Sequence, residues 1–348
     1  MSAEIPAVTG IGAALPDRVI GTSDIQALYP DDIRAQRMVG IVSKMVGIDT
    51  RRWVTPGEQA TSDLGAEALR KAVEMARINL SDITSIAFAT SSPDYHAVPA
   101  SAMLQNELGL SDKIRCRDVG GNACMGLLHA IRDVIVDISN NTYGTKGPQA
   151  AVGVEILSNL VQTAEPDIAT IFGDGGTALI IDMVTPDPGA PTKIGFAFGA
   201  DGSLAESLYI PAGGSKKATS AQTIADNMHV VRMDGPKIKQ EAVRRMVEMS
   251  LAAMDEAGIT SKDAILIPHQ ANAAIMREVA KQLEFPDNQV ISTIDHTGNT
   301  SAASTGIALA EAVGMGRVKR NDRVLMVAFG AGLNYGAIVL PMVGLPRE

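Results

Sequence analysis

Residues 121–135 read GNACMGLLHAIRDVI, and residues 298–313 read GNTSAASTGIALAEAV. Each stretch opens with Gly-Asn and continues with the small and apolar residues of a buried helix. Each is followed by an apolar strand and later by a Gly-rich turn and another strand. The turns are FGDGG at 172–176 and FGAG at 329–332. This pattern predicts two diverged copies of one structural unit, with chance similarity as the alternative for so short a match.

Short apolar runs that predict strands alternate with longer stretches that predict helices. Strands are expected at 83–90, 150–156, 178–184, 265–268, 324–329 and 337–341, and helices at 62–77, 237–257 and 271–283. This alternation predicts an α/β fold with covered sheets. Ser62 is a candidate N-cap, and residues 212–220 predict a surface loop. The sequence PDPGAP marks a boundary between an N-terminal half, 1–186, and a C-terminal half, 187–348.

The composition limits the classes of partner. The chain has 348 residues and a formal net charge of −9, so neither nucleic acid nor an anionic membrane is an expected partner. An acidic carrier protein would need a local basic patch for docking. The sequence has no run of about 18 apolar residues, so no membrane span is expected. Its N-terminus lacks a signal-peptide pattern. Cys116 and Cys124 form no disulfide framework or zinc pattern, which predicts a reduced, cytoplasmic protein without a metal.

Cys124 lies at the start of a predicted helix. The unpaired N–H groups and the dipole at a helix N-terminus stabilise a thiolate, which is a good nucleophile toward a thioester. A lone free cysteine is more often a small buried apolar residue. Taken alone, Cys124 therefore favours a packing role.

Three further positions have chemical potential. His269 follows a predicted strand, where α/β folds place functional groups, although a packing or capping histidine is the simpler interpretation. Asn299 can donate to an oxyanion or serve as a helix N-cap. The backbone N–H groups of Gly330-Ala331-Gly332 can complete an oxyanion hole, or the segment is a simple turn.

Five motifs follow one another along the chain: a cysteine at a helix start, FGDG at 172–175, PHQAN at 268–272, HTGNTSAAS at 296–304 and FGAG at 329–332. In this order and at this separation, the set resembles the β-ketoacyl-(acyl-carrier-protein) synthase III family of thiolase-fold enzymes. The resemblance runs through nearly the whole chain.

The resemblance implies a thiolase-like fold of two similar halves stacked as five layers, αβαβα, in a homodimer. It implies a triad of Cys124, His269 and Asn299 and no cofactor. Cys124 would take an acyl group from an acyl-coenzyme A or acyl-carrier-protein thioester. A malonyl-type thioester would then lose carbon dioxide and attack the acyl-enzyme. The backbone N–H groups of Cys124 and Ala331 would hold the thioester oxyanion, and His269 and Asn299 would stabilise the enolate.

Several positions depart from the family pattern. Val98 stands where the family often has a bulky aromatic residue in the primer channel, so a larger or unusual acyl group is expected. Val98 and Met125 are assigned to the acyl pocket, with core packing as the alternative for Met125. The family's entrance tryptophan is absent, and Lys44 and Asn272 are assigned to substrate binding. Ala274 replaces a family arginine used in carrier-protein docking.

These departures favour a ketosynthase of specialised metabolism over primary fatty-acid elongation. A non-elongating acyltransferase, which would use the same triad to acylate an alcohol or an amine, is the alternative. A catalytically silent subunit is a third possibility, and the presence of all three triad residues argues against it. Degradative thiolase activity is disfavoured because Cys116 lies outside any motif for a second active-site cysteine.

Overall fold

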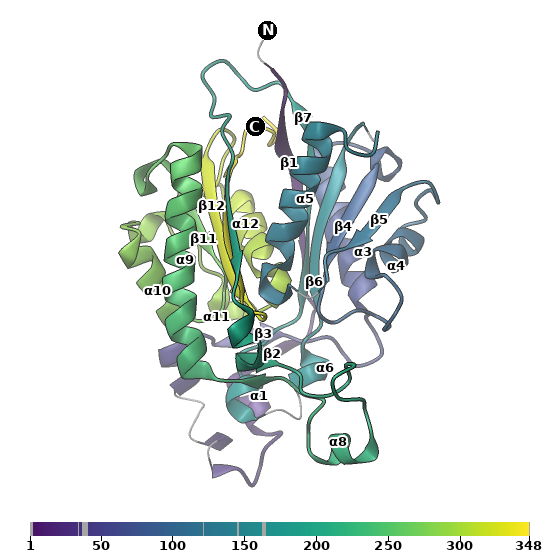
Figure 1. Cartoon of the computed structure of the whole chain (residues 1–348), viewed down its shortest axis with the longest axis vertical. Coiled ribbons are helices and arrows are strands. Elements are labelled where there is room, and N and C mark those ends of the chain that lie inside the picture. Colours follow the sequence, from purple (N-terminus) through teal and green to yellow (C-terminus); the bar gives the residue numbers. More distant parts are fainter. Residues whose placement is uncertain are drawn as a thin grey trace.

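The computed structural model describes residues 3–33, 35–36, 41–120, 122–144, 146–161 and 165–347. Helices and sheets alternate in five layers, as Figure 1 shows. Within the described ranges, no helix combines the length and the apolar character needed to cross a bilayer.

The first sheet has the strand order β1-β7-β6-β4-β5. Its strands are β1 (Ile5–Ala14), β7 (Gly175–Val184), β6 (Gln149–Glu155), β4 (Ser85–Ala89) and β5 (Arg115–Asp118). β7 is antiparallel to both β1 and β6, whereas β6, β4 and β5 run parallel. The expected strands at 83–90, 150–156 and 178–184 are therefore confirmed with small changes of boundary.

The second sheet repeats the plan of the first. Its order is β8-β13-β12-β11, made by β8 (Gly195–Ala200), β13 (Asn334–Pro341), β12 (Arg323–Gly330) and β11 (Ile265–Pro268). β13 is antiparallel to β8 and β12, and β12 is parallel to β11. Strand order and direction thus match those of β1, β7, β6 and β4. The predicted boundary near 186 falls between the last strand of one sheet, β7, and the first strand of the other, β8.

Helices fill the space between the sheets and cover their outer faces (Figure 1). α5 (Gly126–Asn140) and α12 (Ser304–Gly314) pack between the sheets in one apolar core. α3 (Thr61–Ala76) and α4 (Ala100–Glu107) cover the first sheet. α9 (Gly235–Ala257) and α10 (Ala273–Gln282) cover the second. The fold is the predicted five-layer αβαβα arrangement.

The cap expected at Ser62 is wrong by two residues. α3 begins at Thr61, and Ala60 is its N-cap. The backbone N–H of Ala60 donates to the Asp63 carboxylate at 2.7 Å. The acidic side chain in the first turn thus provides a hydrogen-bond partner for the N–H group of the N-cap residue. Ser62 lies inside the helix, where its N–H and hydroxyl both donate to Asp94 Oδ1 at 3.1 and 2.8 Å.

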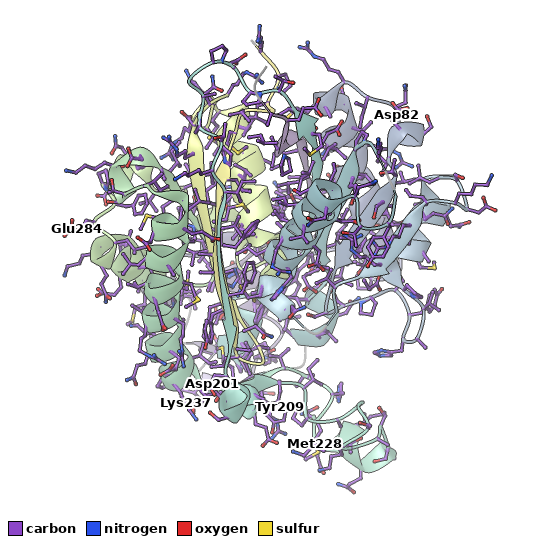
Figure 2. The ribbon with its side chains drawn as sticks, turned by 45° about the horizontal axis from the view of Figure 1, so that its top comes forward. Asp82, Asp201, Tyr209, Met228, Lys237 and Glu284 are labelled. Carbon is purple, nitrogen blue, oxygen red and sulfur yellow. The ribbon has the colours of Figure 1, made fainter. Side chains whose placement is uncertain are left out.

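Short elements surround the layers. The helices are α1 (Thr22–Gln26), η1 (Val42–Val46), η2 (Leu80–Asp82), η3 (Ala123–Met125), α6 (Ser158–Val161), α7 (Pro166–Ala169), η4 (Gly202–Ser207), α8 (Ala221–Ala225), η5 (Ser261–Asp263), η6 (Asp287–Gln289), α11 (Ile294–Thr297) and η7 (Ser301–Ala303). The strands are β2 (Val19–Gly21), β3 (Thr50–Arg52), β9 (Leu208–Tyr209) and β10 (Arg232–Met233). The segment with α8 projects beyond the layers, with Met228 near its end (Figures 1 and 2). It contains the predicted loop at 212–220.

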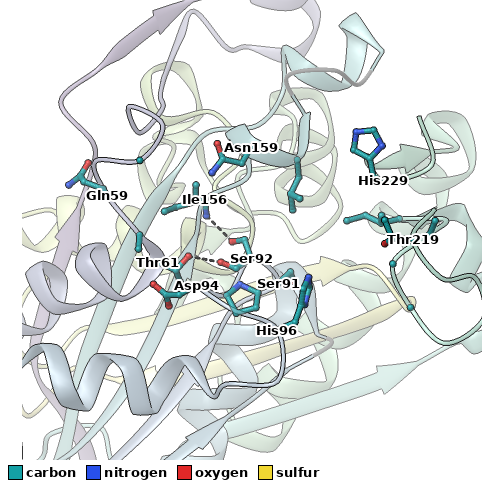
Figure 3. Close-up of a pocket in the computed structure, with 18 residues that line it drawn as sticks. Gln59, Thr61, Ser91, Ser92, Asp94, His96, Ile156, Asn159, Thr219 and His229 are labelled. Atoms are coloured by element: carbon teal, nitrogen blue, oxygen red, sulfur yellow. Dashed lines mark hydrogen bonds between the residues drawn. The ribbon is translucent and has the colours of Figure 1, made fainter. Parts of the chain in front are cut away.

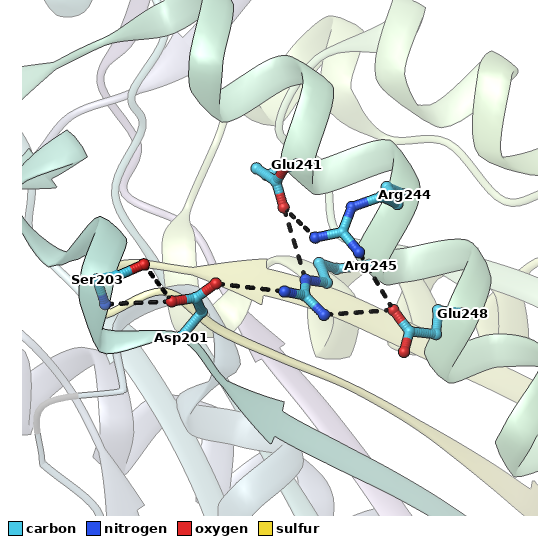
Figure 4. Close-up of polar contacts among 6 residues, drawn as sticks. All are labelled: Asp201, Ser203, Glu241, Arg244, Arg245 and Glu248. Carbon is cyan, nitrogen blue, oxygen red and sulfur yellow. Dashed lines mark hydrogen bonds and ion pairs between the residues drawn. The ribbon is translucent and has the colours of Figure 1, made fainter.

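A charged cluster fixes the base of that projection to α9 (Figure 4). The Arg245 guanidinium contacts Asp201 at 3.3 Å and Glu248 at 3.4 Å. It also lies 4.6 Å from the centre of the Tyr335 ring on β13. The hydroxyl and N–H of Ser203 donate to Asp201 and lower the pKa of its carboxyl. The ion pair therefore links the segment after β8 to α9.

Candidate active site

A cavity of about 270 Å³ gathers residues from both halves of the chain. We call it the Cys124 cavity. Its lining residues are Cys124, Ile171, Phe172, Leu208, Met233, Gly235, Ile238, Lys239, Ala242, Met246, His269, Ala271, Asn272, Ile275, Asn299 and Phe329. Most of the wall is apolar, and Cys124, His269 and Asn299 contribute polar groups to it. Cys124, His269 and Asn299, which are distant in the sequence, thus line the same cavity.

Cys124 lies in the short turn η3, directly before α5, and is 6% exposed. Burial raises the pKa of its thiol to about 12, although Ser301 and the backbone N–H of Cys124 itself oppose this shift. The expected thiolate stabilisation by a helix start is therefore wrong in its net effect, because desolvation outweighs the favourable contacts. Resting Cys124 is a thiol, and its proton must be removed before the sulfur attacks.

The FGAG turn packs against the backbone of Cys124. A Cβ atom placed on Gly330 would lie 3.0 Å from the backbone nitrogen of Cys124 and 3.2 Å from that of Met125. A side chain at this position would fit only if its neighbours moved by a few tenths of an ångström. Ala331 follows directly, so its N–H and that of Cys124 belong to neighbouring backbone segments. Among the described residues, no turn or loop backbone hydrogen bond uses either N–H as donor.

His269 follows β11, and its own N–H donates to Val327 of β12 at 2.7 Å. Its Nδ1 atom lies 2.6 Å from the hydroxyl oxygen of Ser304 at the start of α12. The side chain is 3% exposed, and burial lowers its pKa to about 3. The imidazole is neutral at physiological pH, and Ser304 holds one of its two nitrogens.

Asn299 joins the two halves of the chain. It forms a parallel bridge with Phe172 of the FGDG turn, and its N–H donates to Ile171 at 2.9 Å. Its Oδ1 atom accepts the N–H of Ser301 at 2.8 Å. The capping interpretation is wrong, because Thr300 is the N-cap of η7 and Ala303 that of α12. The Asn299 oxygen instead holds the turn before η7, and the Nδ2 amide is the group able to donate. A Cβ on Gly173 would lie 2.2 Å from the Thr297 carbonyl, so the close approach of the FGDG turn requires glycine.

Comparison with known proteins identifies the family. Residues 254–342 match the family described as 3-Oxoacyl-[acyl-carrier-protein (ACP)] synthase III C terminal. The chain is 34% identical over 333 residues to a beta-ketoacyl-[acyl-carrier-protein] synthase III of Chlamydia caviae, covering 95% of each protein. This chain belongs to the β-ketoacyl-[acyl-carrier-protein] synthase III family. The membership predicted from the five motifs is confirmed.

Solved structures of the synthase III family share the fold. The 3-oxoacyl-[acyl-carrier-protein] synthase III of Aquifex aeolicus VF5 matches with a TM-score of 0.82 at 28% identity, covering 97% of this chain and 99% of that one. The priming β-ketosynthase from the R1128 polyketide biosynthetic pathway matches with a TM-score of 0.85 at 26% identity, covering 99% and 98%. These likenesses confirm the predicted thiolase-like fold.

Of the other residues assigned from the sequence, Asn272 lies at the Cys124 cavity, and Val98, Met125 and Lys44 do not line it. Asn272 lines it, and the Asn272 side chain also caps α10 by accepting the Ala274 N–H at 2.8 Å. Met125 is fully buried in the core between the sheets, and Val98 is 41% exposed on the loop before α4. Lys44 is exposed on η1. The acyl-pocket and substrate-binding assignments of Val98, Met125 and Lys44 stay predictions.

Sequence reasoning missed Glu155. This residue ends β6 and is fully buried, and its carboxylate is held by the Ser92 hydroxyl at 2.7 Å and by the Ser91 N–H at 3.1 Å. The Ser301 hydroxyl also donates to it, at 3.2 Å. Burial raises the pKa of Glu155 to about 7. The sequence feature that could have identified Glu155 is a carboxylate at the end of an otherwise apolar strand, AAVGVE. In the described ranges, no group of three histidine, cysteine, aspartate or glutamate side chains is arranged to hold a metal ion.

Proposed function

We propose that this chain is a decarboxylative ketosynthase that loads an acyl group on Cys124 and condenses it with a malonyl-type thioester. One observation carries the proposal. The Cys124 cavity combines a cysteine with a neutral histidine and an asparagine whose oxygen is already occupied. This set offers one nucleophile and two hydrogen-bond donors, which suits covalent acyl transfer followed by enolate formation.

In the first half-reaction, Cys124 sulfur attacks the carbonyl carbon of an acyl-coenzyme A or acyl-carrier thioester. The new C–S bond forms while the carbonyl oxygen becomes negative. In this proposal the N–H groups of Cys124 and Ala331 stabilise that oxygen, and the close packing of Gly330 against the Cys124 backbone supports the assignment. The C–S bond to the carrier thiol then breaks, and the carrier leaves as a thiolate that takes a proton from solvent.

In the second half-reaction, a malonyl-type thioester loses carbon dioxide and its thioester oxygen gains negative charge. His269 Nε2 and Asn299 Nδ2 are the donors for that oxygen. Ser304 occupies Nδ1, so with its hydroxyl as donor the ring proton lies on Nε2. A neutral imidazole donates without an ionisation step, as an electrophile should. The enolate carbon attacks the acyl-enzyme, and Cys124 leaves and recovers a proton.

The apolar lining of the Cys124 cavity favours a substrate that has few charged groups near its reacting atoms. Ile238, Met246 and Ile275 supply much of that surface, and Lys239 contributes the one cationic side chain among the lining residues. With Val98 in place of an aromatic residue and Ala274 in place of a docking arginine, we assign the reaction to specialised metabolism. The structural likeness to a priming polyketide synthase supports this assignment.

Intact mass measurement after exposure to a panel of acyl thioesters tests the proposal, with Cys124→Ser as the control. We expect a mass increase equal to one acyl group on the unmodified sequence and none on Cys124→Ser. Adding a malonyl thioester should then release carbon dioxide and yield a β-ketoacyl product. Transfer to an alcohol or an amine without carbon dioxide would favour the acyltransferase alternative, and no loading of Cys124 by any donor would contradict both.

A further inference from the structure

We propose that Glu155 is the proton acceptor for Cys124, acting through the hydroxyl of Ser301, and that Ser92 connects this carboxylate to a second cavity. The inference rests on the proposed function, because it concerns how Cys124 becomes a nucleophile. It gives a role to a buried carboxylate that the two half-reactions described above do not use.

Ser301 lies between Cys124 and Glu155 and interacts with both. Interaction with the Ser301 hydroxyl lowers the pKa of Cys124, because the hydroxyl can donate to the thiolate, and the same hydroxyl donates to Glu155 Oε1 at 3.2 Å. A hydroxyl has one proton to donate. The Ser301 proton therefore serves either Glu155 or the Cys124 thiolate, and not both at once. Donation to Glu155 suits the thiol state of Cys124 and donation to sulfur suits the thiolate state, so the change of acceptor accompanies a proton transfer from Cys124 to Glu155.

Ser301 is held in an unfavourable backbone conformation to make these contacts. Its φ angle is +47°, a left-handed value that L side chains rarely adopt. Its N–H is fixed by Asn299 Oδ1 at 2.8 Å, and its side chain is 3% exposed. Such strain concentrates at functional sites. A serine that served packing alone would not need this conformation, which glycine adopts without cost.

Glu155 suits proton acceptance better than His269 does. Burial lowers the pKa of His269 to about 3, so its imidazole resists a second proton. Burial raises the pKa of Glu155 to about 7, and a group that titrates near the working pH is the more effective base. Within the described ranges, no cationic side chain forms an ion pair with Glu155.

The groups that face Glu155 come from three elements. Thr90, Ser91 and Ser92 lie at the end of β4, and Ser301 lies on η7. The Cys124 thiol on η3 is the titratable group in electrostatic contact with the carboxylate. The surrounding donors are all neutral, so the proton on Glu155 responds mainly to Cys124 and to pH.

Ser92 provides a path by which the proton on Glu155 can reach solvent. Its hydroxyl donates to Glu155 Oε2 at 2.7 Å, and Ser92 also lines a cavity of about 620 Å³ (Figure 3). Asp94 and His96 line the same cavity. Glu155 therefore lies between this space and the Cys124 cavity. A proton can reach solvent without crossing the space that the acyl substrate occupies.

Each proton that moves in this step has a donor and an acceptor. The Cys124 proton moves to the Ser301 oxygen while the Ser301 proton moves to Glu155, and the resulting thiolate forms the C–S bond to the acyl group. Glu155 returns its proton to solvent by way of Ser92, and the departing carrier thiolate takes one proton up. After condensation, the expelled Cys124 thiolate is reprotonated along the same chain, which supplies the one proton that the second half-reaction consumes.

The test is the single-turnover rate of Cys124 acylation, followed by intact mass between pH 5.5 and 9 with a saturating acyl-coenzyme A. We expect the rate to rise with pH to a plateau, with a break near pH 7. Glu155→Gln should lower the plateau about 100-fold and abolish the break. Ser301→Gly should do the same, and because glycine accepts the φ of +47° this variant should keep the fold.

Asp137→Asn is the matched control. Asp137 is a buried carboxylate on α5, paired with Arg115 at 3.0 Å and outside both cavities. It should keep the pH break even if stability falls. A Glu155→Gln protein that loads Cys124 at the normal rate with the normal pH break would overturn the inference and leave the proposed function intact. Absence of loading in the unmodified protein would instead refute the proposed function.

Discussion

His269 and Ser304 are joined across the second half of the chain by a contact of 2.6 Å between the imidazole Nδ1 and the hydroxyl oxygen. His269 follows β11, and Ser304 begins α12, so the contact links the end of a strand to the start of a central helix. It fixes the ring orientation. In the proposed mechanism it also fixes the proton on Nε2.

Ser304→Ala should therefore impair decarboxylation more than acyl loading. Without the hydroxyl, a buried ring nitrogen loses its partner, which costs about 1–3 kcal/mol. We expect carbon dioxide release from a malonyl thioester to fall by about 10- to 100-fold, with little change in acylation of Cys124. Ser250→Ala is the control, because Ser250 is also buried and its hydroxyl has no partner among the described residues. Equal losses in both half-reactions would contradict the assignment.

The neutral state of His269 predicts a dependence of stability on pH. Its pKa is about 3 in the folded protein, below the ordinary value of 6.5. Between these values the unfolded chain binds the proton that the folded chain refuses, so stability falls as pH decreases below 6.5. From pH 6.5 to 5 the loss from this residue is about 2 kcal/mol. Urea unfolding at both pH values should show a smaller loss in His269→Gln, and identical losses would be evidence against a neutral histidine.

Much of the architecture follows from local patterns in the sequence. The Gly-Asn repeats, the two Phe-Gly turns and PHQAN lie at boundaries between strands and helices, where residue type reports backbone conformation directly. This is why Cys124, His269 and Asn299 could be singled out. The N-terminal strand β1 and β8 were not predicted, because Gly and Ala residues dilute their apolar patterns, IPAVTGIGAA and GFAFGA.

Long-range contacts could not be predicted from the sequence. Glu155 and Ser301 are 146 positions apart, and no local pattern shows that they meet. The ionisation of Cys124 also depends on how deeply its side chain is buried. A helix start favours the thiolate, but the completed core excludes the water that would solvate the charge. Both features emerge only when the two halves pack together.

The ion pair between His296 and Glu311 predicts a second dependence of stability on pH, opposite in sign to that of His269. His296 Nε2 lies 3.1 Å from Glu311 on α12, and hydrogen bonding to Glu311 raises the pKa of His296 to about 9. The stabilisation is therefore fully present below pH 6.5 and is lost as pH rises through about 9. His296 is half exposed, so solvent screening keeps the gain below about 1 kcal/mol. Urea midpoints at pH 6 and pH 10 should differ less in His296→Gln than in the unmodified protein; an unchanged difference would exclude the pair as a contributor.

The contact between Gly330 and Cys124 predicts a defect specific to the oxyanion hole. In Gly330→Ala the new methyl group would lie 3.0 Å from the Cys124 nitrogen and 3.1 Å from the Asn122 oxygen. The contact between the FGAG turn and the Cys124 segment must open by a few tenths of an ångström, and we expect this to shift the Ala331 N–H relative to the Cys124 N–H. Loss of one oxyanion donor lowers acyl-transfer rates by about 100- to 1,000-fold. We expect that loss in single-turnover loading of Cys124, measured by intact mass. Gly314→Ala is the control, because a methyl group there meets open space at the end of α12. If both variants load Cys124 at the same rate, the N–H groups of this turn do not hold the oxyanion.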